Sequence, residues 1–171
     1  RPVDLLVNNA AMFGQDDWHG MDVDTLEAHF RLNLFTPLLL AKEVAQAAVG
    51  GPRPAIIHIL DQRITNPHGD QVSYTLSKQA LAASVRSMAA SFGSAARVNG
   101  VAPGLVISTD DYDAVLEGRL AQMMPLGALP SPTAVAEAVL YLARATDVTG
   151  QTIFVDGGAH LKSFDRDFMH L

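Results

Sequence analysis

The chain has 171 residues, of which 49% are hydrophobic and 18% charged, with a formal net charge of −6 and a pI of about 5.3. This composition is typical of a soluble globular domain, and its acidic balance argues against nucleic-acid binding, because a negative surface repels phosphate backbones. Cysteine is absent, and the six histidines follow no metal-ligand spacing, so we expect neither a disulfide framework nor a metal site. No apolar stretch is long enough to span a bilayer and no signal peptide is visible, so we expect a cytoplasmic protein.

Strand and helix patterns alternate along the chain, which is typical of a parallel α/β sheet. We expect strands at residues 3–8, 55–60, 96–102 and 152–155. We expect helices at 23–48 with an interruption near Pro37, at 71–92, near 112–122 and at 133–142. Helix caps are expected at Asp22 or Asp24 and at Ser131 or Thr133. The pattern predicts a single domain over 1–171 with a doubly wound parallel sheet of the Rossmann type.

The beginning of the chain lacks a feature that such sheets normally have. Residue 1 is Arg, and the first expected strand follows almost at once. Neither Gly-x-x-x-Gly-x-Gly nor Gly-x-Gly-x-x-Gly occurs, although the first strand of a dinucleotide-binding sheet normally leads into such a glycine-rich phosphate turn. We therefore expect this chain to be the C-terminal two-thirds of a longer domain, without its N-terminal strands.

The most informative local pattern joins Asp61, Tyr74 and Lys78. Tyr74 and Lys78 are four residues apart in the expected helix 71–92, so they share one helical face. A nearby ammonium favours phenolate and lowers the pKa of a tyrosine from about 10, which suits proton exchange during hydride transfer. Asp61 follows the strand 55–60, at the sheet edge where ligands bind in open α/β folds.

Further short motifs accompany this pattern. They are Asn8-Asn9-Ala10 after the first strand, Asn33 in the first helix, Tyr74-x-x-x-Lys78, Pro103-Gly104 after the third strand, and Asp156-Gly157-Gly158 after the fourth. In order and spacing these motifs resemble the short-chain dehydrogenase/reductase family. The resemblance covers almost the whole chain and implies a Rossmann-type oxidoreductase that uses a nicotinamide cofactor.

The resemblance also implies roles for particular residues. Tyr74 is expected to donate the proton, Lys78 to bind the cofactor ribose and lower the tyrosine pKa, and Asn33 to hold a water that connects the lysine to solvent. The expected cofactor-binding residues are Asn9, Ala10, Tyr74, Lys78, Pro103, Gly104, Leu105 and Ser108. NADPH as the cofactor follows from the resemblance alone. So does a homotetramer built through the helices at 23–48 and 71–92, although the alanines of the second helix suit packing on the sheet equally well.

Asp61 departs from the family pattern, in which a serine normally holds the substrate carbonyl. An ionised carboxylate only accepts hydrogen bonds, so it suits a substrate with N–H donors and the reduction of a C=N bond. An aspartate before Tyr-x-x-x-Lys, together with Asn8-Asn9-Ala10-x-x-Phe13, is similar to the family's pteridine reductases. Phe13 is then expected to stack on the pterin ring. Segments 103–105 and 156–162 are similar to those of bacterial dihydromonapterin reductases.

These observations predict an NADPH-dependent reductase of dihydropterins, dihydromonapterin first and dihydrofolate second, with Phe13, Asp61 and Tyr74 as substrate-binding residues. Two alternatives remain open. In one, the protein is a dehydrogenase of ketones or alcohols that tolerates Asp61. In the other, it is a catalytically silent relative that only binds the cofactor. Asp156-Gly157-Gly158 is expected to be a structural turn, and Trp18 and Tyr112 lie in loops that either cover the pocket or face solvent.

Overall fold

The computed structural model describes residues 3–48, 50–106 and 112–171. Within these residues the chain forms a four-stranded sheet in the spatial order β1-β2-β3-β4. The strands are β1 Leu5–Asn8, β2 Ala55–Ile59, β3 Arg97–Pro103 and β4 Thr152–Val155. Each neighbouring pair is parallel, so each connection must cross back over the sheet. The four expected strands are confirmed, with ends that differ by one or two residues.

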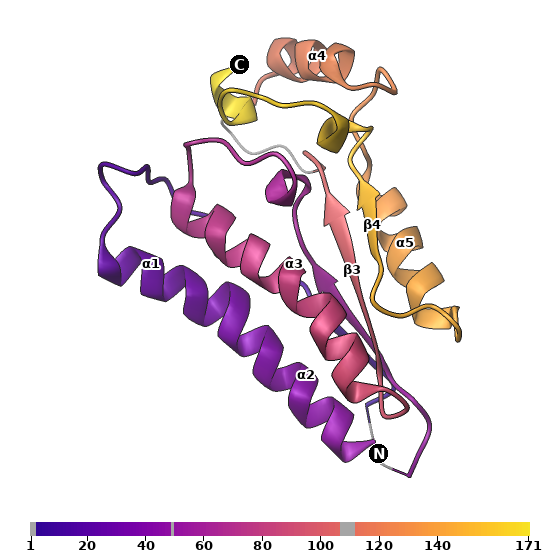
Figure 1. Cartoon of the computed structure of the whole chain (residues 1–171). Helices are drawn as coiled ribbons and strands as arrows, with labels where there is room; N and C mark the ends of the chain where they lie inside the picture. The colour runs from indigo at the N-terminus through magenta and orange to yellow at the C-terminus, as the bar shows by residue number, and fades with distance from the viewer. Residues whose placement is uncertain (1–2, 49, 107–111) are drawn as a thin grey trace.

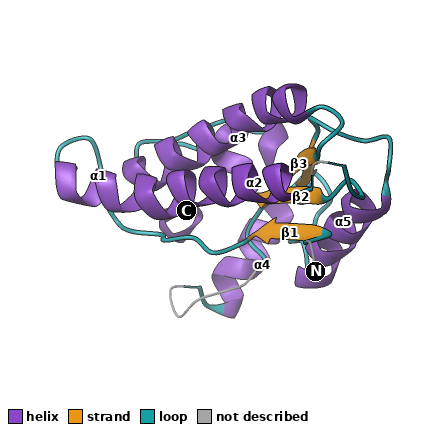
Figure 2. Ribbon diagram, turned by 90° about the horizontal axis from the view of Figure 1, so that it is seen from below, coloured by secondary structure: helices purple, strands orange, loops and turns teal. Residues whose placement is uncertain are grey.

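Helices lie on both faces of this sheet (Figure 1). One face is covered by α2 Thr36–Ala47 and α3 Val72–Phe92, with α1 Val23–Phe30 running alongside α3, and the other by α5 Pro132–Arg144 (Figure 2). The helix α4 Ala114–Met123 lies beyond the ends of the strands, beside the C-terminal segment. One short 3-10 turn follows β2 at Gln62–Ile64. Two more lie in the C-terminal segment after β4, at Ala159–Leu161 and Phe168–His170. This arrangement confirms the doubly wound, Rossmann-type architecture.

The core lies in two layers, one on each side of the sheet. Successive residues Ile56 and Ile57 of β2 are both fully buried and point to opposite faces, which confirms a strand buried on both sides. Ile56 packs with α2 and α3, and Ile57 packs against Leu142 of α5. A third cluster joins Leu120 of α4, and Met124 just after that helix, to the C-terminal segment, and it closes the end of the sheet where ligands bind.

The expected helix at 23–48 is three elements rather than one. The chain leaves α-helical geometry at Arg31–Phe35, a π-helical turn, and regains it in α2. Pro37 does not itself make the break, because it lies in the first turn of α2, where a missing N–H costs little. The caps are Asp22, which accepts the Thr25 N–H at 2.7 Å, and Ser131, which accepts from Ala134 at 3.1 Å.

The described helices contain no candidate for a membrane crossing, since none combines sufficient length with sufficient hydropathy. Over the same residues, no group of three or more histidine, aspartate and glutamate side chains is arranged to hold a metal ion.

Candidate active site

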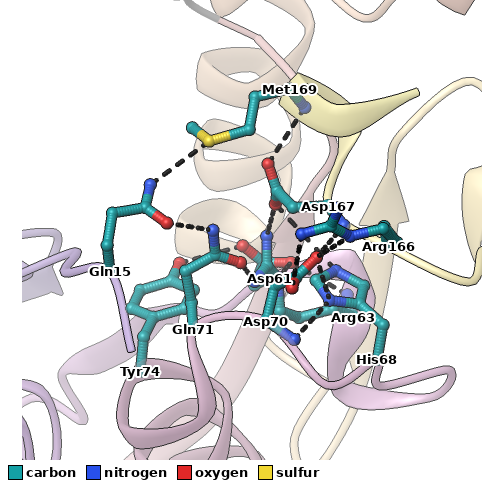
Figure 3. Close-up of polar contacts among 10 residues, drawn as sticks. All are labelled: Gln15, Asp61, Arg63, His68, Asp70, Gln71, Tyr74, Arg166, Asp167 and Met169. Carbon is teal, nitrogen blue, oxygen red and sulfur yellow. Dashed lines mark hydrogen bonds and ion pairs between the residues drawn. The ribbon is translucent and has the colours of Figure 1, made fainter. Parts of the chain in front are cut away.

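Two cavities meet at Tyr74 and Asp61, beyond the carboxyl ends of β2 and β3. The larger, of about 730 Å³, is lined by Asn9, Lys78 and Pro103 on one side and by α5 on the other. The smaller, of about 380 Å³, borders part of the cluster in Figure 3 and has the following further lining residues: Phe13, Gln15, Gln62, Arg63, Tyr112, Asp167, Phe168 and Met169. Asp61, Tyr74, Gly104 and Leu105 line both cavities. The site therefore has two compartments with one tyrosine and one carboxylate between them.

The Tyr74 hydroxyl donates a hydrogen bond to Asp61 Oδ2 at 2.9 Å. The other oxygen of Asp61 accepts the backbone N–H of Arg63 at 2.8 Å, because Asp61 is also the cap of the 3-10 turn after β2. Burial, followed by the charge of Asp61 and its hydrogen bond, raises the pKa of Tyr74 well above its usual value. The expected lowering of this pKa by Lys78 is therefore wrong for this structure. The physical reasons are the burial of the phenol first and then the carboxylate to which its hydroxyl donates.

Lys78 lies on the same helical face as Tyr74, as expected, but its ammonium is directed elsewhere. Its Nζ donates to the carbonyl oxygen of Ile59 at 2.8 Å and lies 5.7 Å from the centroid of the Tyr74 ring. Burial lowers the pKa of Lys78 to about 8, an effect that the charge of Asp61 opposes. The ammonium has three donors and lies in the wall of the larger cavity, a position from which it could donate to a hydroxyl-bearing ligand.

Asn33 lies in the π-helical turn and lines neither cavity. Its Oδ1 accepts the backbone N–H of Met12 at 2.8 Å, and its Nδ2 donates to the carbonyl of Met12 at 2.9 Å and to Ser77 Oγ at 3.0 Å. The side chain therefore connects the loop after β1 to the helix that carries Tyr74. The expected water relay through Asn33 is untested by these contacts and remains a prediction.

The predicted cofactor-binding residues are mostly brought together. Asn9, Pro103, Gly104 and Leu105 line the larger cavity with Tyr74 and Lys78. Ala10 instead lines a separate small cavity with Pro37 and Leu40, while its neighbour Ala11 faces the larger one. Ser108 lies outside the described residues.

Gly104 is required for packing as well as for its place in the site. A Cβ atom there would lie 2.9 Å from Cα of Asp156, a backbone contact that cannot relax cheaply. Asp156 in turn accepts hydrogen bonds from the backbone of Gly158 and His160, and Gly157 and Gly158 have φ values of 66° and 89°. The Asp-Gly-Gly segment is thus a structural turn, as expected.

Phe13 and Tyr74 form the aromatic wall of the smaller cavity. Their ring centroids are 4.8 Å apart in an edge-to-face arrangement, and Phe13 remains 48% exposed. A half-exposed ring at a cavity mouth is suited to stacking on a flat heteroaromatic ligand. Tyr112 also lines this cavity, whereas Trp18 is 64% exposed and lines another, smaller one.

Sequence reasoning missed the group that surrounds Asp61. The buried Arg63 side chain donates to Asp167 Oδ2 at 2.5 Å and to Gln71 Oε1 at 3.0 Å (Figure 3). Asp167 belongs to the C-terminal segment, 104 residues away in the chain, so no local pattern pairs the two. The one local signal was the spacing of Asp61 and Arg63, an acid and a base two residues apart immediately after a buried strand.

Comparisons with known proteins show which proteins this chain is similar to. The family model described as enoyl-(acyl carrier protein) reductase matches residues 1–160. Ketoacyl reductase 2 of the granaticin polyketide synthase of Streptomyces violaceoruber is 39% identical over 63% of this chain and 45% of its own length. Dihydromonapterin reductase of Citrobacter koseri is 29% identical over 81% of this chain and 59% of its own length.

A solved structure, FolM alternative dihydrofolate reductase 1 from Brucella suis in complex with NADP, superposes with a TM-score of 0.89 at 32% identity. The match covers 95% of this chain and 66% of that one, so the chain spans about half to two thirds of these proteins. The family match over nearly the whole chain agrees with the parallel sheet and with the tyrosine and lysine on one helical face. The chain belongs to the short-chain dehydrogenase/reductase family.

Proposed function

We propose that this protein is an NADPH-dependent reductase of dihydropterins, acting on dihydromonapterin and secondarily on dihydrofolate. The observation that carries this proposal is the hydrogen bond of 2.9 Å between the Tyr74 hydroxyl and Asp61, at the junction of two cavities and beside Phe13. The pair combines a proton donor with an acceptor-only carboxylate in one substrate pocket.

The carboxylate argues for a nitrogen-containing substrate. An oxyanion that develops on a reduced ketone would be repelled by Asp61, whereas ring N–H and amino groups would donate hydrogen bonds to it. A pterin offers such donors along its pyrimidine edge and a C=N bond to reduce. Its flat ring also suits the exposed face of Phe13.

The larger cavity suits the nicotinamide and ribose of the cofactor. It reaches Tyr74 and Asp61, Lys78 offers N–H donors to ribose hydroxyls, and Gly104 and Pro103 form a wall without long side chains. When bound, NADPH supplies a hydride to the carbon of the C=N bond and becomes NADP⁺. Tyr74 gives its hydroxyl proton to the nitrogen, which yields a C–H and an N–H bond, and solvent returns the proton to the phenolate.

The relatives support this reading and also a second one. Proteins named dihydromonapterin reductase and alternative dihydrofolate reductase match most of the chain, and the latter was solved with NADP. A ketoacyl reductase matches at higher identity over a shorter stretch, which favours carbonyl reduction as the second candidate. A single domain, a cytoplasmic location and a homotetramer belong to the same proposal.

The test is NADPH oxidation by the protein expressed from its complete gene, followed without oxygen. A dihydropterin is compared with a panel of ketones that includes a β-ketoacyl thioester. Turnover with the dihydropterin alone supports the proposal, and turnover with ketones alone makes Asp61 and Phe13 incidental. NADPH binding without any turnover would favour the silent relative.

A further inference from the structure

Arg63 contacts three groups at the Tyr74 hydroxyl, which are the rings of Tyr74 and Phe13 and the carboxylate of Asp61. Its guanidinium carbon lies 5.3 Å from the centroid of the Tyr74 ring and 5.5 Å from that of Phe13. Its Nε is 3.5 Å from Asp61 Oδ1, and its own backbone N–H binds that same oxygen. The backbone N–H of Arg63 therefore fixes one oxygen of Asp61, the guanidinium places a positive charge beside that oxygen, and the other oxygen is left for the tyrosine.

The guanidinium is itself fixed from two directions. Nη2 donates to Asp167 in the C-terminal segment, and Nη1 donates to Gln71, which begins the helix of Tyr74 in a left-handed conformation with φ of 50°. Gln71 also donates to Gln15, and Gln15 to the sulfur of Met169 at 3.2 Å (Figure 3). A planar group with a rigid fork of donors suits this arrangement, and a lysine could not make both contacts in the same way.

Asp167 is equally well anchored. Its backbone N–H donates to Asp70 Oδ2 at 2.9 Å, and its Oδ1 accepts from Met169 at 3.1 Å. Arg166 pairs with Asp70 at 3.3 Å on the outside of the same turn. The C-terminal segment thus places the buried carboxylate of Asp167 against Arg63. Among the described residues, Arg63 is the one arginine that touches Asp61.

The charges that face Tyr74 come from several elements. Asp61 follows β2, Arg63 lies in the 3-10 turn after it, Lys78 is on the helix of Tyr74, and Asp167 is on the C-terminal segment. His68 faces Asp167 rather than Tyr74, at 3.9 Å. Asp61 and Asp167 raise the pKa of Tyr74, and Arg63 lowers it. Arg63 therefore performs in this structure the electrostatic role that the motif alone assigns to Lys78.

We propose that Arg63, anchored by Asp167, is a positioning residue that holds Asp61 against the Tyr74 hydroxyl and offsets its negative charge there. This inference rests on the proposed role of Tyr74 as the proton donor. The arginine lines the smaller cavity but not the larger one that suits the cofactor. It acts on proton transfer through the two side chains beside it.

The test follows the ionisation of Tyr74 directly, without substrate. The protein expressed from its complete gene is labelled with a fluorinated tyrosine, whose more acidic phenol titrates where the protein stays folded, and the Tyr74 signal is assigned in fluorine NMR with Tyr74→Phe. Arg63→Met should move the midpoint of the titration upward by roughly one pH unit, because it removes the offsetting charge. Asp167→Asn should move it downward, because it removes a negative charge and frees Arg63 for Asp61.

Opposite shifts distinguish an electrostatic role from a structural one, since simple loosening of the loop would move both variants in one direction. Arg63→Lys keeps the charge but not both anchoring contacts, so it should raise the midpoint less than Arg63→Met does. The exposed Arg86→Met on the same helix as Tyr74 should give none of these shifts. Equal midpoints in all variants, or shifts of the same sign in Arg63→Met and Asp167→Asn, would overturn the proposal. If Arg63→Met does not fold, an unchanged or raised midpoint in Asp167→Asn overturns it alone. Because no turnover is needed, absence of pterin reduction would refute the proposed function and leave this test intact.

Discussion

At the scale of single residues, the site places one phenol between a carboxylate and buried cations. Tyr74 donates to Asp61, Arg63 packs over its ring, and Lys78 approaches the ring at 5.7 Å. None of these charged groups is fully solvated, so the charge of each one affects the protonation of its neighbours.

Asp61→Ser tests whether the carboxylate matters to the reaction. We expect dihydropterin turnover to fall roughly 100-fold, the usual scale for one group in acid–base catalysis, while NADPH affinity stays near that of the wild type. Steady-state kinetics and a cofactor titration measure the two effects. The exposed Asp24→Ser serves as the matched control. Unchanged turnover in Asp61→Ser would remove the reason for giving this residue a role.

Lys78→Met separates stability from activity. Burial lowers the pKa of Lys78 to about 8 from 10.5, so the folded protein binds this proton less tightly than the unfolded chain does. The resulting cost is present in full below about pH 8 and disappears as the pH rises toward 10.5. We therefore expect the variant to be more stable than the wild type at neutral pH, by on the order of 2 kcal/mol after loss of the bond to Ile59, and inactive.

The measurement is denaturant unfolding at a series of pH values. The stability advantage of Lys78→Met should be greatest at neutral pH and should shrink steadily above about pH 8. An advantage that is independent of pH would mean that the ammonium is not the source of the cost.

At the scale of elements, the π-helical turn at Arg31–Phe35 is the feature that places Asn33. Its side chain pairs with both backbone groups of Met12, next to Phe13. Asn33→Ala leaves these two groups without partners, which should cost roughly 2 kcal/mol of stability. Since the loop of Phe13 loosens, we also expect the KM for the pterin to rise several-fold while the KM for NADPH changes little. Ser77→Ala is the control, because it removes the third bond of Asn33 and the bond from Ser77 to the Tyr74 carbonyl but leaves both backbone groups of Met12 paired.

The elements show what the sequence can and cannot predict. Strands and helices followed from local periodicity and caps, so β2 was predicted within one residue and Ser131 was a correct cap. The π-turn was not predicted, because Pro37 was the only local sign of a break and it lies two residues beyond the end of the turn, in the first turn of α2. Asp61 and Tyr74 came together as expected, since a strand end and a helical face define both positions.

The remaining features depend on tertiary contacts. Arg63 pairs with Asp167 across 104 residues of chain, and the local spacing of Asp61 and Arg63 gives no sign of this distant partner. The direction of the Tyr74 pKa was predicted wrongly for the same reason. The motif counts one lysine, whereas the folded site adds a carboxylate at 2.9 Å and removes water.

At the scale of the whole molecule, an apolar face remains exposed on the outer side of the first helical run. Leu32, Phe35 and Leu39 are spaced by three and four residues, and they are 38%, 47% and 59% exposed. The buried alanines of the neighbouring helix, such as Ala89, pack toward the sheet instead, which leaves the outer face to α1, the π-turn and α2. A row of large exposed apolar side chains is typical of a surface that another protein covers.

We propose that this face joins copies of the chain in the homotetramer, and Leu39→Glu tests it. Placing a charge in a buried apolar contact is costly, so we expect the variant to sediment as a smaller species at concentrations where the wild type is tetrameric. Val115→Glu on α4 is the control, because Val115 is also apolar and 72% exposed but lies away from this face. It should leave sedimentation unchanged. A tetramer that survives Leu39→Glu and Phe35→Glu would place the interface elsewhere, and a wild type that sediments as a monomer would refute the assembly itself.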